Sequence, residues 1–427
     1  MDRISFKNWT LIWLLGMAGQ ICRNVENSWF NTFVYVKIAP SPYIVSSMVV
    51  VSAVVTTFST FLIGTWSDRA GRRKPFIAAG YILWGCFTIV FGATQFLPKS
   101  PLLLVAVVVL AVKAIMSFLG ALGYAGAYCP WTTDISAEHN RGRIGGAFAT
   151  MPVLATIFGA GVSGILIDAI DFFPFFIFMG ALVAVAGLAT LLLLKDATML
   201  KPKKDGDGYW RQFASVFKYK TLAANPELAW VFVVMLVYFS GFNTYFPYIT
   251  IYFTSYIGLD YTMTGILQGV GLLAAVFFTF PAARLIDRGQ TPAVILAAII
   301  ATCAGLLVFA LARSIFPLFI GVFGAGLGYI LMTQTLTAWI KNLFPDDQRG
   351  QFEGVRTLFA TGFPMIVGPA IASVAIASFG MKRIINGVAG TVPTESLFLA
   401  SLGATVFTLL PLIPAMGLFK RRMAATN

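Results

Sequence analysis

Histidine and cysteine are scarce in this chain of 427 residues, and their scarcity excludes most catalytic sites. His139 is the only histidine, so neither a histidine-based catalytic triad nor a histidine metal cluster can be built. The four cysteines, Cys22, Cys86, Cys129 and Cys303, lack metal-ligand spacing and are interpreted as buried thiols without a disulfide framework. A phosphate loop of the form G-x-x-x-x-G-K-S/T is also missing, so ATP is not the energy source that the sequence encodes. We therefore expect no enzyme, no metal and no cofactor.

Charged residues make up only 11% of the chain, whereas 58% of its residues are hydrophobic. This balance excludes a soluble globular domain. The apolar runs predict membrane helices in the first half near 10–36, 43–66, 75–97, 101–130, 144–170 and 173–194. They predict further helices in the second half near 227–257, 262–285, 291–312, 315–341, 353–379 and 396–419. The sequence therefore predicts an all-α membrane protein with twelve transmembrane helices.

Lysine and arginine are distributed unevenly between the predicted loops, and this asymmetry gives the topology. With the N-terminus in the cytoplasm, 22 of the 30 lysines and arginines lie in cytoplasmic loops or termini. The opposite loops carry only Lys37, Lys99, Arg313, Lys382 and Arg383. Both termini of a cell-membrane protein are therefore expected inside. The net charge of +13 faces anionic lipid headgroups, so we expect the lipid bilayer as a partner and no nucleic acid.

The polar stretch from Lys195 to Pro226 cannot cross a membrane and divides the chain into two halves. We expect an N-terminal six-helix bundle at 1–195, a cytoplasmic linker at 196–226 and a C-terminal six-helix bundle at 227–427. The segment before the first span is too short and too directly joined to it for a cleaved signal, so the first helix is expected to be retained. A monomer is the expected oligomeric state.

The two halves carry similar motifs at similar positions. Asp287-Arg288-Gly289 after the eighth span is similar to Asp68-Arg69-Ala70-Gly71 after the second. Arg349-Gly350 after the tenth span likewise matches Arg141-Gly142 after the fourth. The offsets of 219 and 208 residues indicate a duplicated unit with small insertions.

The turn after the second span is the most specific motif, Gly64-Thr65-Trp66-Ser67-Asp68-Arg69-Ala70-Gly71-Arg72-Arg73-Lys74. It resembles the G-x-x-x-D-R-x-G-R-R-K signature of the major facilitator superfamily. The resemblance implies a secondary transporter in which two pseudo-symmetric six-helix bundles rock about a midplane site. It assigns gating roles to the residues of this turn and its counterparts, namely Gly64, Asp68, Arg69, Gly71, Arg72, Arg141, Asp287, Arg288 and Arg349.

Elementary physics also gives this turn a role. Gly64 allows one helix end to approach a neighbour, and Asp68 can face the positive N-terminus of another helix. The arginines then hold the turn at the cytoplasmic surface. The alternative is an ordinary, positively charged membrane loop.

Two further loop motifs indicate a branch of the superfamily. Pro130-Trp131-Thr132-Thr133-Asp134 before Arg141-Gly142, and Arg72-Arg73-Lys74-Pro75-Phe76-Ile77, resemble the glycoside-pentoside-hexuronide cation symporters and the sucrose-transporter relatives. Melibiose-type symporters place acids in the second and fourth helices, whereas here 43–66 has none and the fourth span carries Lys113. A proton is therefore a better candidate than sodium for the coupling ion.

These features leave several functions open. The leading one is proton-coupled transport of a small polar solute, a sugar or glycoside, by alternating access. The alternative is a proton-coupled exporter of amphipathic drugs or lipids, and a third is a membrane receptor or scaffold that does not transport. The surplus of Arg23 and Lys113 over Glu26 also leaves open an anionic substrate such as a uronide or a sugar phosphate.

Ionisable residues inside a span cost about 2.5–3.5 kcal/mol each on insertion scales, so the few present are functional candidates. They are Arg23 and Glu26 in the first span, Lys113 in the fourth, and Glu353 and Arg356 at the start of the eleventh. Arg23 and Glu26 are three residues apart and are predicted to pair, with Lys113 competing for Glu26. A carboxylate between two cations can exchange a proton or a partner, so Glu26 with Arg23 is the predicted coupling site. The alternative is a fixed structural pair, with Lys113 in a packing role.

Substrate contacts are expected to combine aromatic faces, amides and the buried cations. Aromatic residues in spans also face lipid or pack against neighbours, so the amides are the stronger candidates. The predicted substrate-binding residues are Arg23, Asn27, Lys113, Tyr124, Tyr128, Asn243, Tyr245, Gln268 and Gln334.

Overall fold

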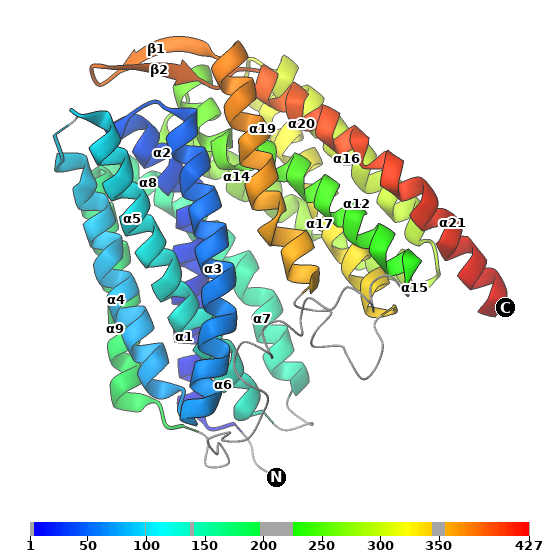
Figure 1. The fold of residues 1–427 in the computed structure, drawn as a ribbon, viewed down its shortest axis with the longest axis horizontal. Coiled ribbons are helices and arrows are strands. Elements are labelled where there is room, and N and C mark those ends of the chain that lie inside the picture. Colours follow the sequence, from blue (N-terminus) through cyan, green and yellow to red (C-terminus); the bar gives the residue numbers. More distant parts are fainter. Residues whose placement is uncertain (1–3, 99, 137–140, 197–224, 344–354, 427) are drawn as a thin grey trace. The chain divides into compact units, whose positions relative to one another are not determined.

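A computed structural model describes residues 4–98, 100–136, 141–196, 225–343 and 355–426, and helices dominate it (Figure 1). The chain forms two compact units. The first comprises Met1–Tyr209 with Asp260–Ile266 and Ile385–Val388, and the second comprises Trp210–Leu259, Leu267–Ile384 and Ala389–Asn427. The predicted linker lies almost entirely outside the described residues, so the predicted bundle boundaries stay a prediction.

The N-terminal half begins with one helical run built from α1 (Phe6–Val25), η1 (Glu26–Phe30), α2 (Asn31–Phe33) and η2 (Val34–Ile38). The next helices are α3 (Pro42–Ala70), α4 (Lys74–Ala93) with η3 (Thr94–Phe96), and the run α5 (Leu102–Gly120), η4 (Ala121–Tyr128) and α6 (Cys129–Asp134). This half ends with α7 (Arg141–Thr156), η5 (Ile157–Val162), α8 (Ser163–Ile170) and α9 (Phe172–Leu193). The segments η1, η2, η4 and η5 are π-helical, so the widened turns fall inside membrane-length helices.

The C-terminal half begins with α12 (Pro226–Tyr245), η6 (Phe246–Tyr248), α13 (Ile249–Ile251) and η7 (Tyr252–Ile257). It continues with α14 (Tyr261–Val276), α15 (Thr279–Asp287), α16 (Thr291–Leu311) and α17 (Ile315–Lys341). The last elements are η8 (Leu358–Gly362), α19 (Pro364–Phe379), β1 (Met381–Ile385), β2 (Val388–Val392), α20 (Ser396–Phe407) and α21 (Leu409–Thr426). A short break separates α14 from α15 within the predicted eighth span.

Eleven helical segments of the described chain are long and apolar enough to cross a membrane. The helical run Phe6–Ile38 supplies the remaining predicted span. It has the necessary length, but it carries Arg23, Glu26 and several amides, which lower its hydropathy. The predicted all-helical membrane fold is therefore confirmed, and its helices begin and end within a few residues of the predicted boundaries.

The hairpin of β1 and β2 was not predicted from the sequence, which assigned this region to a loop. Its turn contains Asn386 with φ 49° and Gly387 with φ 80°, both left-handed. Two consecutive left-handed residues are typical of a tight hairpin turn, and Asn-Gly is its strongest short-range signal. The signal was therefore present in the sequence.

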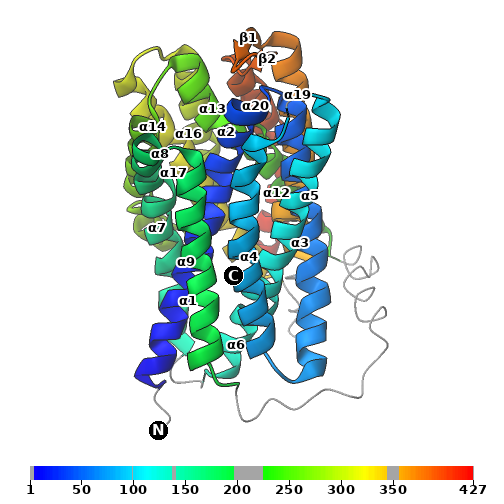
Figure 2. The same cartoon turned by 90° about the vertical axis from the view of Figure 1, so that its left-hand side faces the viewer.

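The core of the first unit is packed with aromatic rings and close helix contacts. Phe30 stacks on Phe91 with ring centroids 4.5 Å apart, and Phe176 meets Phe30 edge-on at 4.9 Å. Helices α4 and α9 run side by side (Figure 2). They approach where Gly85 faces Gly180, since a Cβ added to Gly85 would lie 2.3 Å from the Gly180 carbonyl oxygen. Small residues allow this backbone contact, which holds the α4 side of the unit rigidly.

Candidate functional site

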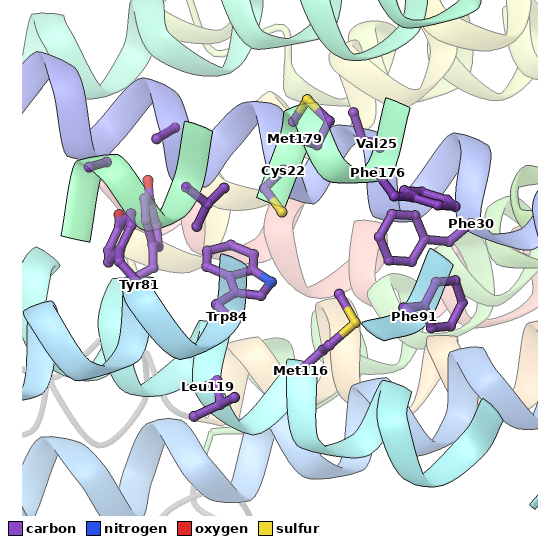
Figure 3. Packing of buried hydrophobic residues seen from close by; sticks show 14 of the residues in the cluster. Cys22, Val25, Phe30, Tyr81, Trp84, Phe91, Met116, Leu119, Phe176 and Met179 are labelled. Carbon is purple, nitrogen blue, oxygen red and sulfur yellow. The ribbon is translucent and has the colours of Figure 1, made fainter. Parts of the chain in front are cut away.

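Glu26 lies at the start of η1, near the middle of the first helical run, and three side chains from different helices contact it. Its Oε2 is 2.5 Å from Nζ of Lys113 on α5. Its Oε1 accepts a hydrogen bond of 2.8 Å from Nε1 of Trp84 on α4, and Sγ of Cys22 approaches the same oxygen at 3.9 Å. Cys22 and Trp84 belong to the hydrophobic core of the first unit, part of which Figure 3 shows together with Met116. We call Glu26, Trp84 and Lys113 the Glu26 cluster.

Burial makes the Glu26 cluster energetically significant. The exposed fractions of the Lys113 and Glu26 side chains are 6% and 11%. The Lys113 ammonium also lies 5.1 Å from the centroid of the Phe30 ring, where it gains a cation–π contact. Removing one partner of a buried ion pair costs about 3–5 kcal/mol because the other charge is left without compensation. The two charges therefore depend on each other.

The predicted Arg23–Glu26 pair is wrong for this structure. Arg23 instead places its guanidinium 5.0 Å from the centroid of the Tyr124 ring. The physical reason is that the carboxylate of Glu26 is turned toward α4 and α5, where Trp84 and Lys113 both donate to it. Lys113 thus competes successfully for Glu26, as the sequence left open, while Arg23 has no ion pair among the described residues.

The other predicted substrate residues of the first unit differ in exposure. Asn27 is exposed. Tyr124 is buried, and its hydroxyl accepts a hydrogen bond of 2.7 Å from Nε2 of Gln20. Tyr128 is completely buried, donates to the carbonyl of Ile12 at 2.7 Å and stacks on Phe148. Tyr128 therefore packs helices together here, and its role as a substrate contact stays a prediction.

In the second unit, three of the four predicted substrate residues have contacts that serve packing. Nδ2 of Asn243 donates to the Phe239 carbonyl at 2.8 Å, and Nε2 of Gln268 donates to the Thr250 hydroxyl at 3.1 Å. Tyr245 is buried against the rings of Phe309 and Phe398. Asn243 and Gln268 have their polar partners within the second unit, and Tyr245 has its aromatic neighbours there. An unpaired amide inside a membrane is costly, so the two amides require such partners.

Gln334 has different surroundings. Its Nε2 donates to the Thr279 carbonyl at 3.1 Å, but its buried Oε1 has no hydrogen-bond partner among the described residues. The side chain lines a cavity of about 510 Å³ together with Thr279, Tyr329, Ile330, Thr333, Thr337, Ala338 and Lys341. We call this cavity the Gln334 pocket. An unused carbonyl oxygen in a cavity is a ready acceptor for a bound molecule.

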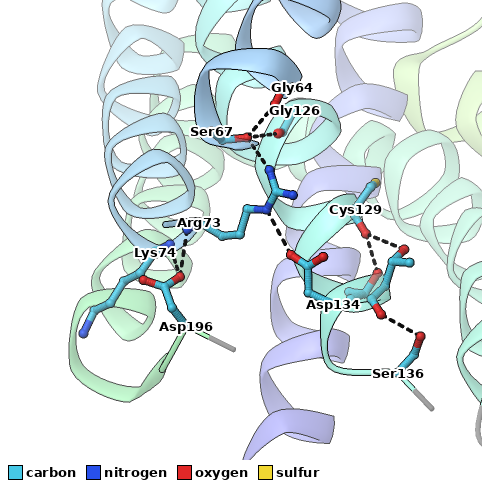
Figure 4. Close-up of polar contacts among 11 residues, drawn as sticks. Gly64, Ser67, Arg73, Lys74, Gly126, Cys129, Asp134, Ser136 and Asp196 are labelled. Atoms are coloured by element: carbon cyan, nitrogen blue, oxygen red, sulfur yellow. Dashed lines mark hydrogen bonds and ion pairs between the residues drawn. The ribbon is translucent and has the colours of Figure 1, made fainter. Parts of the chain in front are cut away.

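The signature turn is organised by Arg73, a residue that the sequence did not single out (Figure 4). Its side chain is 6% exposed, donates to the Ser67 hydroxyl and lies 3.0 Å from Oδ2 of Asp134. Oδ1 of Asp196 accepts from the backbone amides of Arg73 and Lys74 at 2.8 and 2.9 Å, which caps the start of α4. The turn is thereby tied to the ends of α6 and α9.

The predicted gating residues are only partly visible in this arrangement. Arg69 and Arg72 are exposed, and Gly71 has φ 62°, a left-handed conformation that glycine adopts without strain. A Cβ added to Gly64 would meet no described atom within 4 Å, so the described residues show no close approach there. The counterparts Asp287 and Arg288 are exposed at the end of α15. The side chains of Asp68 and Arg141, and all of Arg349 and Glu353, lie outside the described residues.

A second buried carboxylate, also missed from the sequence, lies in the second unit. Glu227 at the start of α12 accepts a hydrogen bond of 2.8 Å from Nε1 of Trp339 on α17. Arg422 on α21 donates to both of its oxygens, from Nε to Oε2 at 3.0 Å and from Nη2 to Oε1 at 3.2 Å. We call Glu227, Trp339 and Arg422 the Glu227 cluster. Nothing in the sequence indicated that a charged residue at the edge of one span would contact a tryptophan in another.

Membrane-length helices with a buried charge cluster inside one unit identify an integral membrane protein. The chain matches the model of the Major Facilitator Superfamily over residues 12–369 and 231–424, and it belongs to this family. Its members are transporters, which supports the expectation that the chain is not an enzyme.

Individual relatives are distant. The "Multi-drug resistance efflux pump PmrA homolog" of Lactococcus lactis subsp. lactis (strain IL1403) is 24% identical over 331 residues, which cover 74% of each chain. The nucleoside transporter NupG has a TM-score of 0.68 at 13% identity, over 96% of this chain and 99% of that one. A bacterial homologue of the human lysosomal transporter Spinster has a TM-score of 0.70 at 15% identity, over 98% and 97%. These structural likenesses show the fold alone.

Proposed function

We propose that this chain is a secondary active transporter that couples a small polar solute to protons through Glu26. The observation that carries the proposal is the buried contact of Glu26 with Lys113 and Trp84 inside the first unit. Charges at membrane depth are expensive and are retained where they have a function. The charged side chains of the Glu26 cluster are together less exposed than those of the Glu227 cluster.

Protonation of Glu26 would change what Lys113 contacts. In the paired state the carboxylate neutralises the ammonium group at 2.5 Å. Once the carboxylate binds a proton, Lys113 loses its counter-charge, and the buried arrangement is no longer favourable. A proton therefore favours one packing of the helices that carry Glu26 and Lys113 over another. A difference in affinity between two conformations is the requirement for coupling.

A sugar or glycoside, imported together with the proton, is the leading substrate. Gln20, Asn24 and Asn27 lie beside Arg23 on the same stretch of helix and offer paired donors and acceptors. Such groups suit a polyol in a partly dry cavity. The resemblance of the loops around Asp134 and Lys74 to glycoside-pentoside-hexuronide cation symporters supports the same class.

Export of amphipathic drugs or lipids in exchange for protons is the second candidate. The Gln334 pocket favours it, because most of the surface that its lining residues expose to the pocket is apolar. The relative from Lactococcus lactis, named as a multi-drug resistance efflux pump, favours it as well.

Proton flux in proteoliposomes that contain a pH-sensitive dye tests the proposal and separates the two candidates. Glucose, methyl glucoside and ethidium are added in turn, and the solute that drives protons identifies the class. In Glu26→Gln we expect proton flux to be abolished and exchange of the same solute to persist, because glutamine mimics only the protonated acid. Glu227→Gln is the matched control, since Glu227 also binds a tryptophan and a cation, and it is expected to retain proton flux. Unchanged proton flux in Glu26→Gln contradicts the proposal.

We further propose that the chain is a monomer in the cell membrane with both termini in the cytoplasm. The excess of lysine and arginine in the loops on one side supports this orientation. The test replaces Ser5 by cysteine and treats intact cells with a thiol reagent that cannot cross the membrane. Stronger labelling of this variant than of the protein with its native cysteines alone would contradict the orientation.

A further inference from the structure

Arg23 is a partly buried cation that forms no ion pair with any described residue. Its side chain is partly buried near the middle of the helical run Phe6–Ile38. Its guanidinium rests on the Tyr124 ring, with 5.0 Å between Cζ and the ring centroid, and it forms no ion pair among the described residues. A contact with an aromatic face compensates a charge only in part. An anion would therefore compensate the rest of this charge.

The chain has few acids that could serve. Of its 17 aspartates and glutamates, Glu26 alone lies in the interior of a predicted span, and the others fall at span ends or in loops. Glu26 is already committed, since Lys113 and Trp84 donate to its two oxygens. The three charges Arg23, Lys113 and Glu26 thus leave one positive charge in excess, and Arg23 carries it.

The surroundings of Arg23 can bind more than a point charge. The Tyr124 hydroxyl accepts from Gln20 at 2.7 Å, so its own proton is available for another acceptor. Arginine offers a planar fork of N–H donors that matches a carboxylate or a phosphate with two parallel hydrogen bonds. Exposed Asn27 provides an amide about one turn further along the helix. Arg23, the Tyr124 hydroxyl and Asn27 thus supply donors for an acidic group that is attached to a larger polar molecule.

We propose that Arg23, with the Tyr124 hydroxyl, binds the acidic group of the transported solute, which is an organic carboxylate or phosphate. This inference rests on the proposed transport function and narrows its substrate class. Lys113 takes no part in this recognition, because it holds Glu26. The two cations therefore have separate tasks: Arg23 binds the solute, and Lys113 responds to the protonation of Glu26.

Matched acidic and neutral probes test the inference by their binding to purified protein in nanodiscs. The pairs are glucuronate with glucose, glucose 6-phosphate with glucose, and benzoate with benzyl alcohol, so the acidic group varies on two different scaffolds. We expect at least one acid to bind tenfold or more tightly than its neutral partner, which corresponds to about 1.4 kcal/mol. Arg23→Gln is expected to remove this preference, and Arg23→Lys to retain part of it, because lysine keeps the charge but loses the planar fork. Equal binding of acids and neutrals throughout the panel overturns the inference.

The stability of the ligand-free protein provides a second measurement that needs no substrate. Arg23→Met keeps the contact with Tyr124 but removes the charge, so we expect an unchanged or higher melting temperature. Lys113→Met leaves Glu26 uncompensated, so we expect a clear decrease. An equal decrease in both variants would mean that Arg23 has an anionic partner within the protein, and the inference would then be wrong.

The outcomes separate this inference from the proposed coupling. If Glu26→Gln loses proton flux while acids and neutrals bind alike, coupling stands and the anionic substrate is rejected. If acids bind through Arg23 while Glu26→Gln still moves protons, the anionic substrate stands and the coupling role of Glu26 is rejected. Glu227→Gln serves in both assays as the control for loss of an unrelated carboxylate.

Discussion

The Glu26 cluster and the Glu227 cluster use the same types of group in the two units, a carboxylate between an indole N–H and a cation. The carboxylates are equally buried, with exposed side-chain fractions of 11% for Glu26 and 12% for Glu227. The cations differ, because Lys113 is 6% exposed and Arg422 is 35% exposed. The same chemistry is therefore placed in two different dielectric environments.

Position along the helices explains what each cluster does. Glu227, Trp339 and Arg422 lie near the ends of α12, α17 and α21, where water can solvate Arg422. The bidentate contact there ties three helix ends together, which is a structural role. Glu26 and Lys113 lie inside their helical runs, and a lysine makes a single, separable contact. The comparison shows that the two clusters differ in the burial of the cation and hardly at all in the burial of the acid.

Lys113→Met is expected to have the largest effect on stability. It leaves Glu26 buried with only Trp84 as a donor, so the free energy of unfolding is expected to fall by about 3–5 kcal/mol. Denaturant unfolding in mixed micelles measures this loss. The double variant Glu26→Leu with Lys113→Met removes both charges and is expected to recover most of it. If the double variant does not recover stability, the loss in Lys113→Met arises from lost packing. The comparison of the two clusters by the burial of their charges would then be wrong.

Arg422→Met is expected to have an intermediate effect. It removes the hydrogen bonds from Arg422 to the Glu227 carboxylate, but Arg422 is 35% exposed and water can take its place there, so we expect a loss of about 1–2 kcal/mol in the same assay. Arg422→Lys is expected to lose nearly as much, since lysine cannot form the bidentate contact. A loss as large as that of Lys113→Met would show that both clusters are equally desolvated.

Lys37→Met is expected to have the smallest effect. Lys37 lies 2.7 Å from Asp171 in an exposed pair, which limits the loss to below about 1 kcal/mol. Burial would raise the pKa of Asp171, but the hydrogen bonds from Lys37 and the Phe172 amide outweigh it and hold the pKa below its ordinary value. The stabilisation is therefore present at neutral pH and is lost as the pH falls through this lowered pKa. Melting temperatures of the wild-type protein and of Lys37→Met, measured at pH 7 and pH 3, check this direction. The difference in melting temperature between the two proteins must be smaller at pH 3.

Local patterns were sufficient to predict the helices and the signature turn. A membrane span must satisfy its own backbone hydrogen bonds, so its length and apolarity are visible in a single stretch of sequence. The same reasoning located the charges at Arg23, Glu26 and Lys113, because each interrupts an apolar run. The hairpin around Asn386 and Gly387 was also readable from its turn residues, although it was not predicted.

The partners of these charges were not predictable from the sequence. Trp84 stands in an apolar run like any core residue, and only the packing of α4 brings its N–H to Glu26. Spacing along one helix favoured Arg23 as the partner of Glu26, but Lys113, distant in the sequence, takes that place. Likewise, nothing local distinguishes Arg73 from Arg72, yet only Arg73 turns inward to Ser67 and Asp134.

The sequence by itself thus determined the family, the membrane spans and the depth of the buried charges, because hydropathy and turn motifs are local properties. Only the tertiary structure decided that Lys113 neutralises Glu26, while Arg23 forms no ion pair within the described part of the chain. The physical reason is that an ion pair is selected by the three-dimensional convergence of donors from separate helices, and the free-energy cost of desolvating each charge depends on that packing.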